Sequence, residues 1–208
     1  MNVRSKRVVL MSLAAATLVA SLSACVPLVV GGGFASGVMV AMDRRTSGAQ
    51  LEDQGIELRG ANRIKEALGE NARVSVTSYN RQVLLTGEVA RTEDIQRAEQ
   101  IVAKVENVSS VVNDLAVGIP AALTQRSTDL LITSKVKASL IDAKDLQANA
   151  FKVVTERNVV YLMGRVTTRE ANRATEIARG VKDVAKVVRV FETLTEEELA
   201  RLGQQPAK

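Results

Sequence analysis

The chain has 208 residues and a formal net charge of +5, and 46% of it is apolar, but it contains no Trp, three Phe and two Tyr, so any core must be aliphatic. It has no His, the commonest general base and metal ligand, which argues against Ser-His-Asp or Cys-His catalysis and against a zinc site of the usual kind. One Cys cannot form an internal disulfide bond. The composition therefore predicts neither an enzyme nor a cofactor-binding protein.

Residues 1–24 have the pattern of a secretory signal peptide, in which cations at positions 4, 6 and 7 precede the apolar run 8–20. The sequence Leu-Ser-Ala-Cys at 22–25 resembles a bacterial lipobox. A lipobox implies diacylglyceryl transfer to the thiol of Cys25, cleavage before this residue and N-acylation with a fatty acid such as palmitate. The alternative is an ordinary signal peptide with a chance Cys.

Residue Val26 follows, not the Asp associated with inner-membrane retention of lipoproteins, so the expected location is the periplasmic leaflet of the outer membrane. Three acyl chains exceed what stable anchoring needs. Segment 27–42 is apolar and Gly-rich, but it is short for a bilayer-spanning helix. We interpret residues 25–52 as the lipidated Cys and a tether on the membrane surface, with a packed core strand as the alternative.

The rest of the chain is a duplication, because the strand sequence at 83–89 returns at 160–166 with its glycine 77 positions later. Upstream of each copy lies an apolar stripe with helical spacing. The two stripes, aligned 72 positions apart, are Leu58, Ala61, Ile64 and Leu68 in the first copy and Leu130, Thr133, Val136 and Leu140 in the second. This alignment leaves five extra residues in the loop 141–150.

Each copy continues with a hairpin, formed by strand 74–76 or 151–153 and the glycine strand. Thr92 and Thr168 are predicted to cap a polar helix, with Asp94 or Glu170 in its first turn. The β-branched runs 108–117 and 184–190 predict a last strand in each copy. The fold class is α+β: two tandem α-β-β-α-β domains, 53–118 and 126–194, each a three-stranded mixed sheet with two helices on one face, joined by linker 119–125 and followed by tail 195–208.

Gly87 and Gly164 lie inside predicted strands. A catalytic role is one interpretation, but glycine in a strand more often marks a bulge or a place where a helix backbone approaches closely. No glycine-rich phosphate-binding loop accompanies either residue. We therefore expect both glycines to be structural.

The charge is unevenly distributed. Signal cleavage would leave 25 cations against 23 anions, but segment 53–118 has a net charge of −2 and segment 126–194 a net charge of +5. An anchored periplasmic protein does not meet nucleic acid, and the chain lacks base-stacking aromatics, so anionic phospholipid is the expected partner of the basic domain. A solvated basic face without a ligand is the alternative.

The helix that opens the second domain carries apolar residues that the first copy lacks. With the 72-residue offset, Leu131, Ile132 and Ile141 replace Arg59, Gly60 and Gly69. An outward Leu beside Lys heads is typical of an interfacial membrane helix. The predicted phospholipid-binding residues are Leu131, Ile132, Lys135, Lys137 and Lys144. Alternatively, Leu131 packs on the other domain or on residues 118–125.

The paired glycine strands, the lipobox and the segments 132–136 and 153–156 resemble the family of outer-membrane lipoproteins with two BON domains. The resemblance implies a non-enzymatic role in outer-membrane integrity, binding of anionic phospholipid through the first helix of the second domain, and enrichment at the division site. Similar proteins have Trp where this chain has Leu131. The alternative function is a protein-interaction adaptor for outer-membrane assembly, division or peptidoglycan-remodelling proteins.

Overall fold

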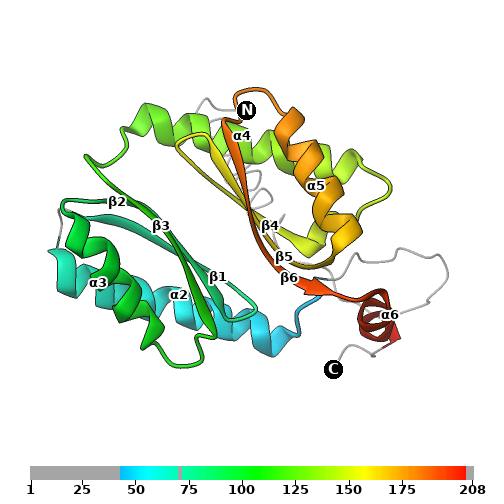
Figure 1. The fold of residues 1–208 in the computed structure, drawn as a ribbon, viewed down its shortest axis with the longest axis horizontal. Coiled ribbons are helices and arrows are strands. Elements are labelled where there is room, and N and C mark those ends of the chain that lie inside the picture. Colours follow the sequence, from blue (N-terminus) through cyan, green and yellow to red (C-terminus); the bar gives the residue numbers. More distant parts are fainter. Residues whose placement is uncertain (1–42, 70–71, 205–208) are drawn as a thin grey trace, which may run out of the picture. The chain divides into compact units, whose positions relative to one another are not determined.

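The computed structural model describes residues 43–69 and 72–204. The predicted signal peptide, the predicted lipidation site Cys25 and most of the predicted tether lie outside the described residues. The first repeat consists of α2 (Ser47–Leu68), β1 (Arg73–Tyr79), β2 (Gln82–Val89), α3 (Thr92–Ala103) and β3 (Ser110–Val117), in this order (Figure 1).

The second repeat consists of α4 (Leu123–Asp142), the short 3-10 helix η3 (Ala148–Ala150), β4 (Phe151–Glu156), β5 (Val159–Thr167), α5 (Thr168–Gly180) and β6 (Lys186–Leu194). A further helix, α6 (Glu196–Gln204), follows in the segment expected to be a tail. The predicted α+β fold with two α-β-β-α-β domains is confirmed.

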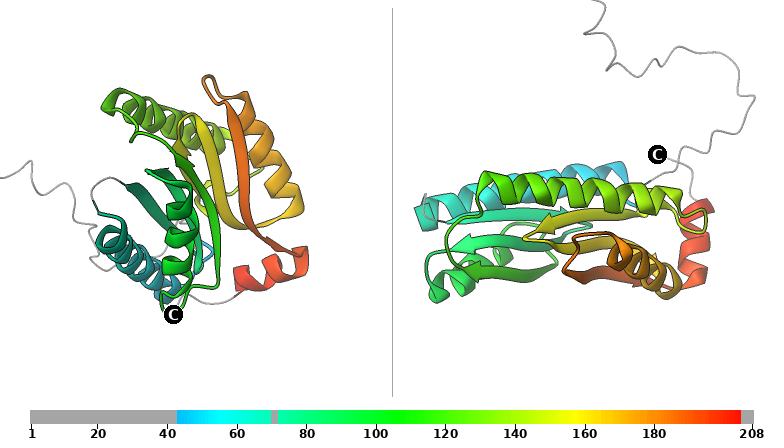
Figure 2. Two further views of the ribbon diagram at one scale, coloured as in Figure 1. Left: turned by 60° about the vertical axis from the view of Figure 1, so that its left-hand side comes forward. Right: turned by 90° about the horizontal axis from the view of Figure 1, so that it is seen from above.

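The two sheets have the same topology, with strand orders β1-β2-β3 and β4-β5-β6. In each sheet the first pair is an antiparallel hairpin and the second pair is parallel, because a helix carries the chain back before the last strand begins. The sequence predicted mixed sheets but gave no strand order. Figure 2 shows each sheet with its helices from two further sides.

The central strands β2 and β5 are buried on both faces. Val83 and Leu85 contact the helices of their own repeat, whereas Leu84 between them points the other way. There it joins a cluster shared by both repeats, made of Tyr79, Leu84, Tyr161, Met163 and Val190. A strand covered on both faces needs consecutive apolar residues, which explains why these strands do not alternate between apolar and polar.

Each hairpin turn is held by a buried aspartate from the preceding helix. The turn residues have positive φ angles, 50° and 68° at Asn80 and Arg81 and 49° and 64° at Arg157 and Asn158, as two-residue type I′ turns require. Asp53 accepts both turn N–H groups of the first repeat at 2.8 Å. Asp129 accepts those of the second repeat at 2.9 and 3.0 Å.

These aspartates show that the predicted helix alignment was wrong by one turn. The buried positions of the first helix are Asp53, Ile56, Gly60 and Ile64, and those of α4 are Asp129, Ile132, Val136 and Leu140, an offset of 76 throughout. Leu58 and Leu130, which we expected in the core, are both exposed. Because the hairpins are 77 residues apart, the second repeat has one extra residue before its first strand, not five.

The N-termini of the second helices also differ from the prediction. The N-cap of α5 is Thr167, not Thr168, and it forms a capping box with Glu170. The corresponding N-cap of α3 is Arg91, without a side-chain capping bond, so Thr92 lies inside the helix.

Gly87 lies against the backbone of the neighbouring strand β1, and Gly164 lies against the backbone of Ala150, the last residue of the 3-10 helix η3. A Cβ atom on Gly87 would be 2.0 Å from the carbonyl oxygen of Arg73, and Gly87 has a φ of +117°. A Cβ atom on Gly164 would be 2.4 Å from the carbonyl oxygen of Ala150. The glycines therefore allow a close backbone approach, and their effect on stability stays a prediction.

Candidate functional site

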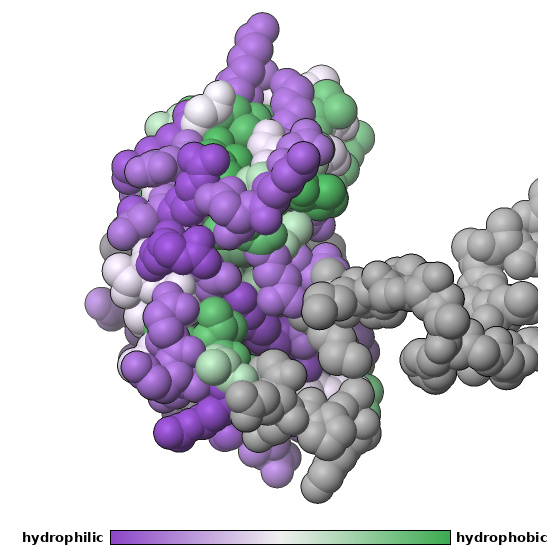
Figure 3. All heavy atoms as spheres, turned by 90° about the vertical axis from the view of Figure 1, so that its right-hand side faces the viewer, coloured by the Kyte–Doolittle hydropathy of each residue, from purple (hydrophilic) through white to green (hydrophobic). Residues whose placement is uncertain are grey.

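The outer surface of α4 exposes four large apolar side chains: Leu123, Leu130, Leu131 and Ile141. At 3.6 residues per turn they project within about 100° of one another. The helix has 20 residues, so this apolar face extends over about 30 Å. Exposed apolar residues also occur between hydrophilic ones on the face drawn in Figure 3.

Three lysines lie along or beyond this face. Lys135 and Lys137 are exposed on α4, and Lys144 is exposed in the loop that follows the helix. The ammonium group of Lys135 is 3.3 Å from a carboxylate oxygen of Asp183, in a pair that is about half exposed. Leu131 is 63% exposed, so it packs neither on the other domain nor on the linker. The arrangement of apolar side chains flanked by lysines is that of an interfacial helix.

Ile132 corrects one of the predicted lipid-binding residues. Its side chain is 1% exposed and packs in the core of the second repeat against strand residues such as Val160 and Leu162. It corresponds to the equally buried Ile56 of the first repeat. The mistaken offset of 72 had made it look like an addition of the second repeat, whereas it belongs to the core that both repeats share.

The first described residue of the chain lies beside the C-terminal half of α4. A cavity of about 380 Å³ is lined by Asp43, by Lys137, Leu140 and Ile141 of α4, and by residues that include Phe151. Asp43 is the first described residue and lies within the segment 25–52 that was predicted as a tether, whose last residues belong to α2 instead. The described chain therefore begins next to the C-terminal half of the apolar face.

The next residue, Arg44, binds the second repeat. Its guanidinium group donates to both carboxylate oxygens of Glu170 at 2.7 and 2.8 Å and to the carbonyl oxygen of Arg165 at 2.8 Å. The side chains of Arg44 and Glu170 are 6% and 4% exposed. Burial raises the pKa of Glu170, but the hydrogen bonds from Arg44 and from the backbone of Thr167 outweigh it and hold this pKa below its ordinary value.

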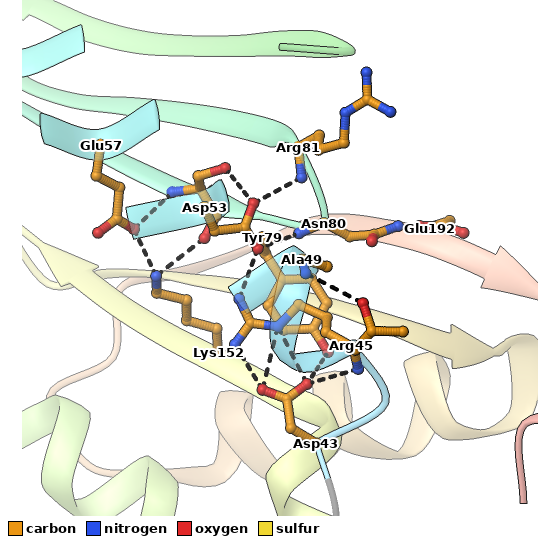
Figure 4. Close-up of polar contacts among 12 residues, drawn as sticks. Asp43, Arg45, Ala49, Asp53, Glu57, Tyr79, Asn80, Arg81, Lys152 and Glu192 are labelled. Atoms are coloured by element: carbon orange, nitrogen blue, oxygen red, sulfur yellow. Dashed lines mark hydrogen bonds and ion pairs between the residues drawn. The ribbon is translucent and has the colours of Figure 1, made fainter. Parts of the chain in front are cut away.

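Arg45 binds the first repeat (Figure 4). It donates to Asp53 at 2.7 Å and to Asp43 at 2.6 Å, and its guanidinium carbon lies 4.2 Å from the centre of the Tyr79 ring. Burial, followed by the charge of Asp43, raises the pKa of Tyr79 to about 12. Two consecutive arginines thus hold the start of the described chain to different repeats. We call residues 43–45 the clasp.

Further ion pairs join the repeats. Glu88 is completely buried and accepts from Arg157 at 2.5 Å and from Arg73 at 3.0 Å. Its burial raises its pKa, but the hydrogen bonds from Arg73, from the backbone N–H of Ala121 and from Arg157 leave the pKa below its ordinary value. Lys152 pairs with Glu57 at 2.7 Å.

Within the described ranges 43–69 and 72–204, no helix is long and apolar enough to cross a membrane. The same residues contain no group of three or more acidic or Cys side chains suited to hold a metal ion. The candidate functional site is the exposed apolar face of α4 with its lysines.

The BON domain matches residues 61–119 and 128–194, so this chain belongs to the BON-domain family and contains two such domains. It is 35% identical over 175 residues to the outer membrane lipoprotein DolP of Haemophilus influenzae. The aligned region covers 83% of this chain and 90% of that protein. The resemblance to lipoproteins with two BON domains is thereby confirmed, and the chain is DolP-like.

The chain is also 35% identical to the 21 kDa hemolysin of Actinobacillus pleuropneumoniae over 152 residues, 72% of this chain and 78% of that protein. Among solved structures it is similar to CdsD, a structural protein of the type III secretion system of Chlamydia trachomatis. That likeness has a TM-score of 0.30 and 12% identity, and it covers 70% of this chain and 98% of CdsD.

Sequence reasoning missed two parts of the site. Leu130 was assigned to the core, and Leu123 to the linker, although both lie on the apolar face of α4. An aspartate precedes each hairpin turn, Asp53 by 27 residues and Asp129 by 28, and this pair was the signal that would have set the helix alignment. The clasp was also missed, because no local pattern reveals that Arg44 and Arg45 pair with residues far along the chain.

Proposed function

We propose that this chain is a non-enzymatic lipoprotein, anchored through Cys25 in the periplasmic leaflet of the outer membrane, whose second BON domain binds anionic phospholipid through α4 and so supports outer-membrane integrity, with enrichment at the division site. DolP is named as an outer membrane lipoprotein, so the similarity to it supports both the location in the outer membrane and the lipid anchor. The lipobox-like sequence before Cys25 supports acylation at that residue.

The observation that carries the lipid-binding part is the outer face of α4. Leu131 and its apolar neighbours are exposed on one side of a helix whose lysines flank them. Apolar side chains gain free energy in the interfacial region, and lysines gain it from the negative potential of anionic headgroups. The corresponding helix of the first repeat has Gly55 and Lys65 at the positions of Leu131 and Ile141, with the offset of 76.

The clasp supports an orientation in which the apolar face of α4 is turned toward the membrane. Asp43 lies in the cavity beside Lys137 and Ile141, so an anchor that precedes it connects to the folded part near the apolar face. The lipid anchor and the apolar face of α4 then contact the membrane from neighbouring parts of the protein. A lipid-anchored domain has a high effective concentration at the bilayer, so even weak binding by α4 is sufficient.

A second candidate is a protein-interaction adaptor for envelope-assembly, division or peptidoglycan-remodelling proteins. The observation in its favour is the pair Leu51 and Leu58, which are exposed two turns apart on α2 of the first repeat. This pair has no flanking basic cluster comparable to that of the second domain, which has a net charge of +5 against −2. Lipid binding is therefore the better supported function.

Flotation of residues 43–208 with liposomes tests the proposal without the acyl chains and without residues 1–42. Wild-type protein should float with vesicles that contain phosphatidylglycerol, and less so in high salt. Leu131→Glu should abolish flotation, because it removes about 1.5–3 kcal/mol of apolar burial and adds a repelled charge.

The matched control is Leu58→Glu, since Leu58 is 65% exposed on α2, close to the 63% of Leu131. This variant should float like the wild type. A folded Leu131→Glu variant that still floats would place lipid binding elsewhere, and equal loss in both variants would indicate a nonspecific effect of charge.

A further inference from the structure

The outward surface of α5 and the segment after it carry cations that the first repeat lacks. The two repeats align here with an offset of 76, because β6 and β3 pair with their central strands in this register and Asn107 and Asp183 both have positive φ angles, 66° and 75°. Segment 169–189 has a net charge of +3, and the equivalent segment 93–113 has a net charge of −2.

The difference arises at exposed positions. Arg169, Arg179, Lys182 and Arg189 stand where the first repeat has Glu93, Ala103, Glu106 and Asn113. We call these four residues together with the exposed Arg173, which has its equivalent in Arg97, the α5 surface. Because the first repeat builds the same elements without the four extra cations, the fold does not require them.

The α5 surface borders the apolar face of α4. Both helices pack on the same side of the β4-β5-β6 sheet (Figure 1). Lys135 of α4 pairs with Asp183 beyond the C-terminal end of α5, and Arg173 of α5 pairs at 3.0 Å with Asp145 beyond the C-terminal end of α4. Each contact joins an inner residue of one helix to the segment that follows the other helix, so the two helices lie side by side and a flat surface that touches the outer side of α4 also reaches α5.

Most of these cations have unused hydrogen-bonding capacity. Arg179 and Lys182 form no ion pair with any residue of the described ranges, and both are exposed. Arg189 donates to the amide oxygen of Asn172, a neutral group, and Arg169 to the carbonyl oxygen of Asp145. Such guanidinium and ammonium groups are suited to phosphate oxygens.

We propose that the α5 surface is a second lipid contact of this domain, which binds the phosphate groups of anionic phospholipid while α4 inserts its apolar side chains. The inference rests on the proposed function and extends it from one helix to two. The partner is the surface of a bilayer, because the cations are spread along a helix and its neighbouring strand beside an apolar face, and charge complementarity selects anionic headgroups.

The test replaces three cations of the second repeat with the residues found at the equivalent positions of the first repeat. The triple variant Arg169→Glu, Arg179→Ala and Lys182→Glu introduces residues that the same backbone positions already hold in the first repeat. The full chain with Cys25→Ala is used, and binding is measured as the difference between phosphatidylcholine vesicles with and without phosphatidylglycerol. This difference cancels contributions that do not depend on lipid charge.

Each cation near an anionic surface contributes about a fivefold change in affinity, so the loss of three cations should lower the affinity by on the order of a hundredfold or more, because the two new Glu residues add repulsion, and should weaken the salt dependence. The control moves the charge: Glu93→Arg, Ala103→Arg and Glu106→Lys, added to the triple variant, restore the net charge on the first repeat. If position matters, this control should not restore binding.

Unchanged phosphatidylglycerol-dependent binding by the folded triple variant overturns the inference and leaves the role of α4 intact. Restoration by the moved charges overturns it as well, because net charge would then suffice. Absence of such binding in the unsubstituted chain overturns both proposals. If circular dichroism shows that the triple variant is unfolded, Lys182→Glu alone, in the loop after α5, must lower the affinity at least fivefold for the inference to hold.

Discussion

Leu131 and Ile132 are consecutive in α4, yet the first is 63% exposed and the second is 1% exposed. The 100° between successive helical side chains points one toward solvent and the other into the core of the second repeat. The two residues therefore separate the contribution of α4 to binding from its contribution to folding.

Ile132→Ala should destabilise the second domain by about 2–5 kcal/mol, because it leaves a cavity in a packed core. Leu131→Ala should change the free energy of unfolding by less than about 0.5 kcal/mol. Urea denaturation measures both. A large loss in Leu131→Ala would mean that this side chain is buried against a part of the chain in solution.

Gly164→Val should lower the unfolding midpoint, because even its Cβ atom would lie 2.4 Å from the carbonyl oxygen of Ala150. Gly87→Val should do the same and adds backbone strain at a φ of +117°. Gly180→Ala is the control, since a Cβ atom there meets nothing within 4 Å. A fully stable Gly164→Val domain that had lost only lipid binding would show that this glycine acts in the site.

Arg44→Ala should destabilise the protein by about 3–5 kcal/mol, because it leaves the carboxylate of Glu170 buried without its partner. The comparison is Lys135→Ala, which breaks a half-exposed pair with Asp183 and should cost about 0–1 kcal/mol. Thermal or chemical unfolding distinguishes the two variants. Equal, small losses would mean that the clasp opens readily.

Glu88 makes stability depend on pH. Its pKa in the folded protein lies below the ordinary 4.5, so its contribution is fully present above 4.5 and is lost as the pH falls through the folded-state pKa. Glu88→Gln should be less stable than the wild type at neutral pH, and this difference should shrink below pH 4.5. Denaturation curves at both pH values test this, and a constant difference would contradict it.

Cys25→Ala should prevent acylation and move the protein out of the outer-membrane fraction, because the chain has no other thiol. Labelling with radioactive palmitate followed by membrane fractionation measures both effects. Palmitate label that persists in this variant would refute the lipoprotein assignment.

The amino-acid sequence by itself determined the duplication, the α-β-β-α-β units and the family, because the glycine strands and the β-branched runs are local patterns that repeat at a fixed distance. It also indicated an outward Leu131. Periodicity could not fix the alignment of the first helices, because a slip of four residues, about one helical turn, again places apolar residues in a stripe. That error moved Ile132 to the surface and Leu58 and Leu130 to the core.

The tertiary structure decided what depends on distant pairs of residues. Burial of Asp53 and Asp129 beneath the hairpin turns set the helix alignment, and the pairing of Arg44 with Glu170 across 126 positions formed the clasp. The contact of Leu84 with the other repeat explained why both faces of its strand are apolar. Hydrogen bonds and packing of this kind connect residues that are far apart in the sequence and follow no regular spacing, so only the folded chain reveals them.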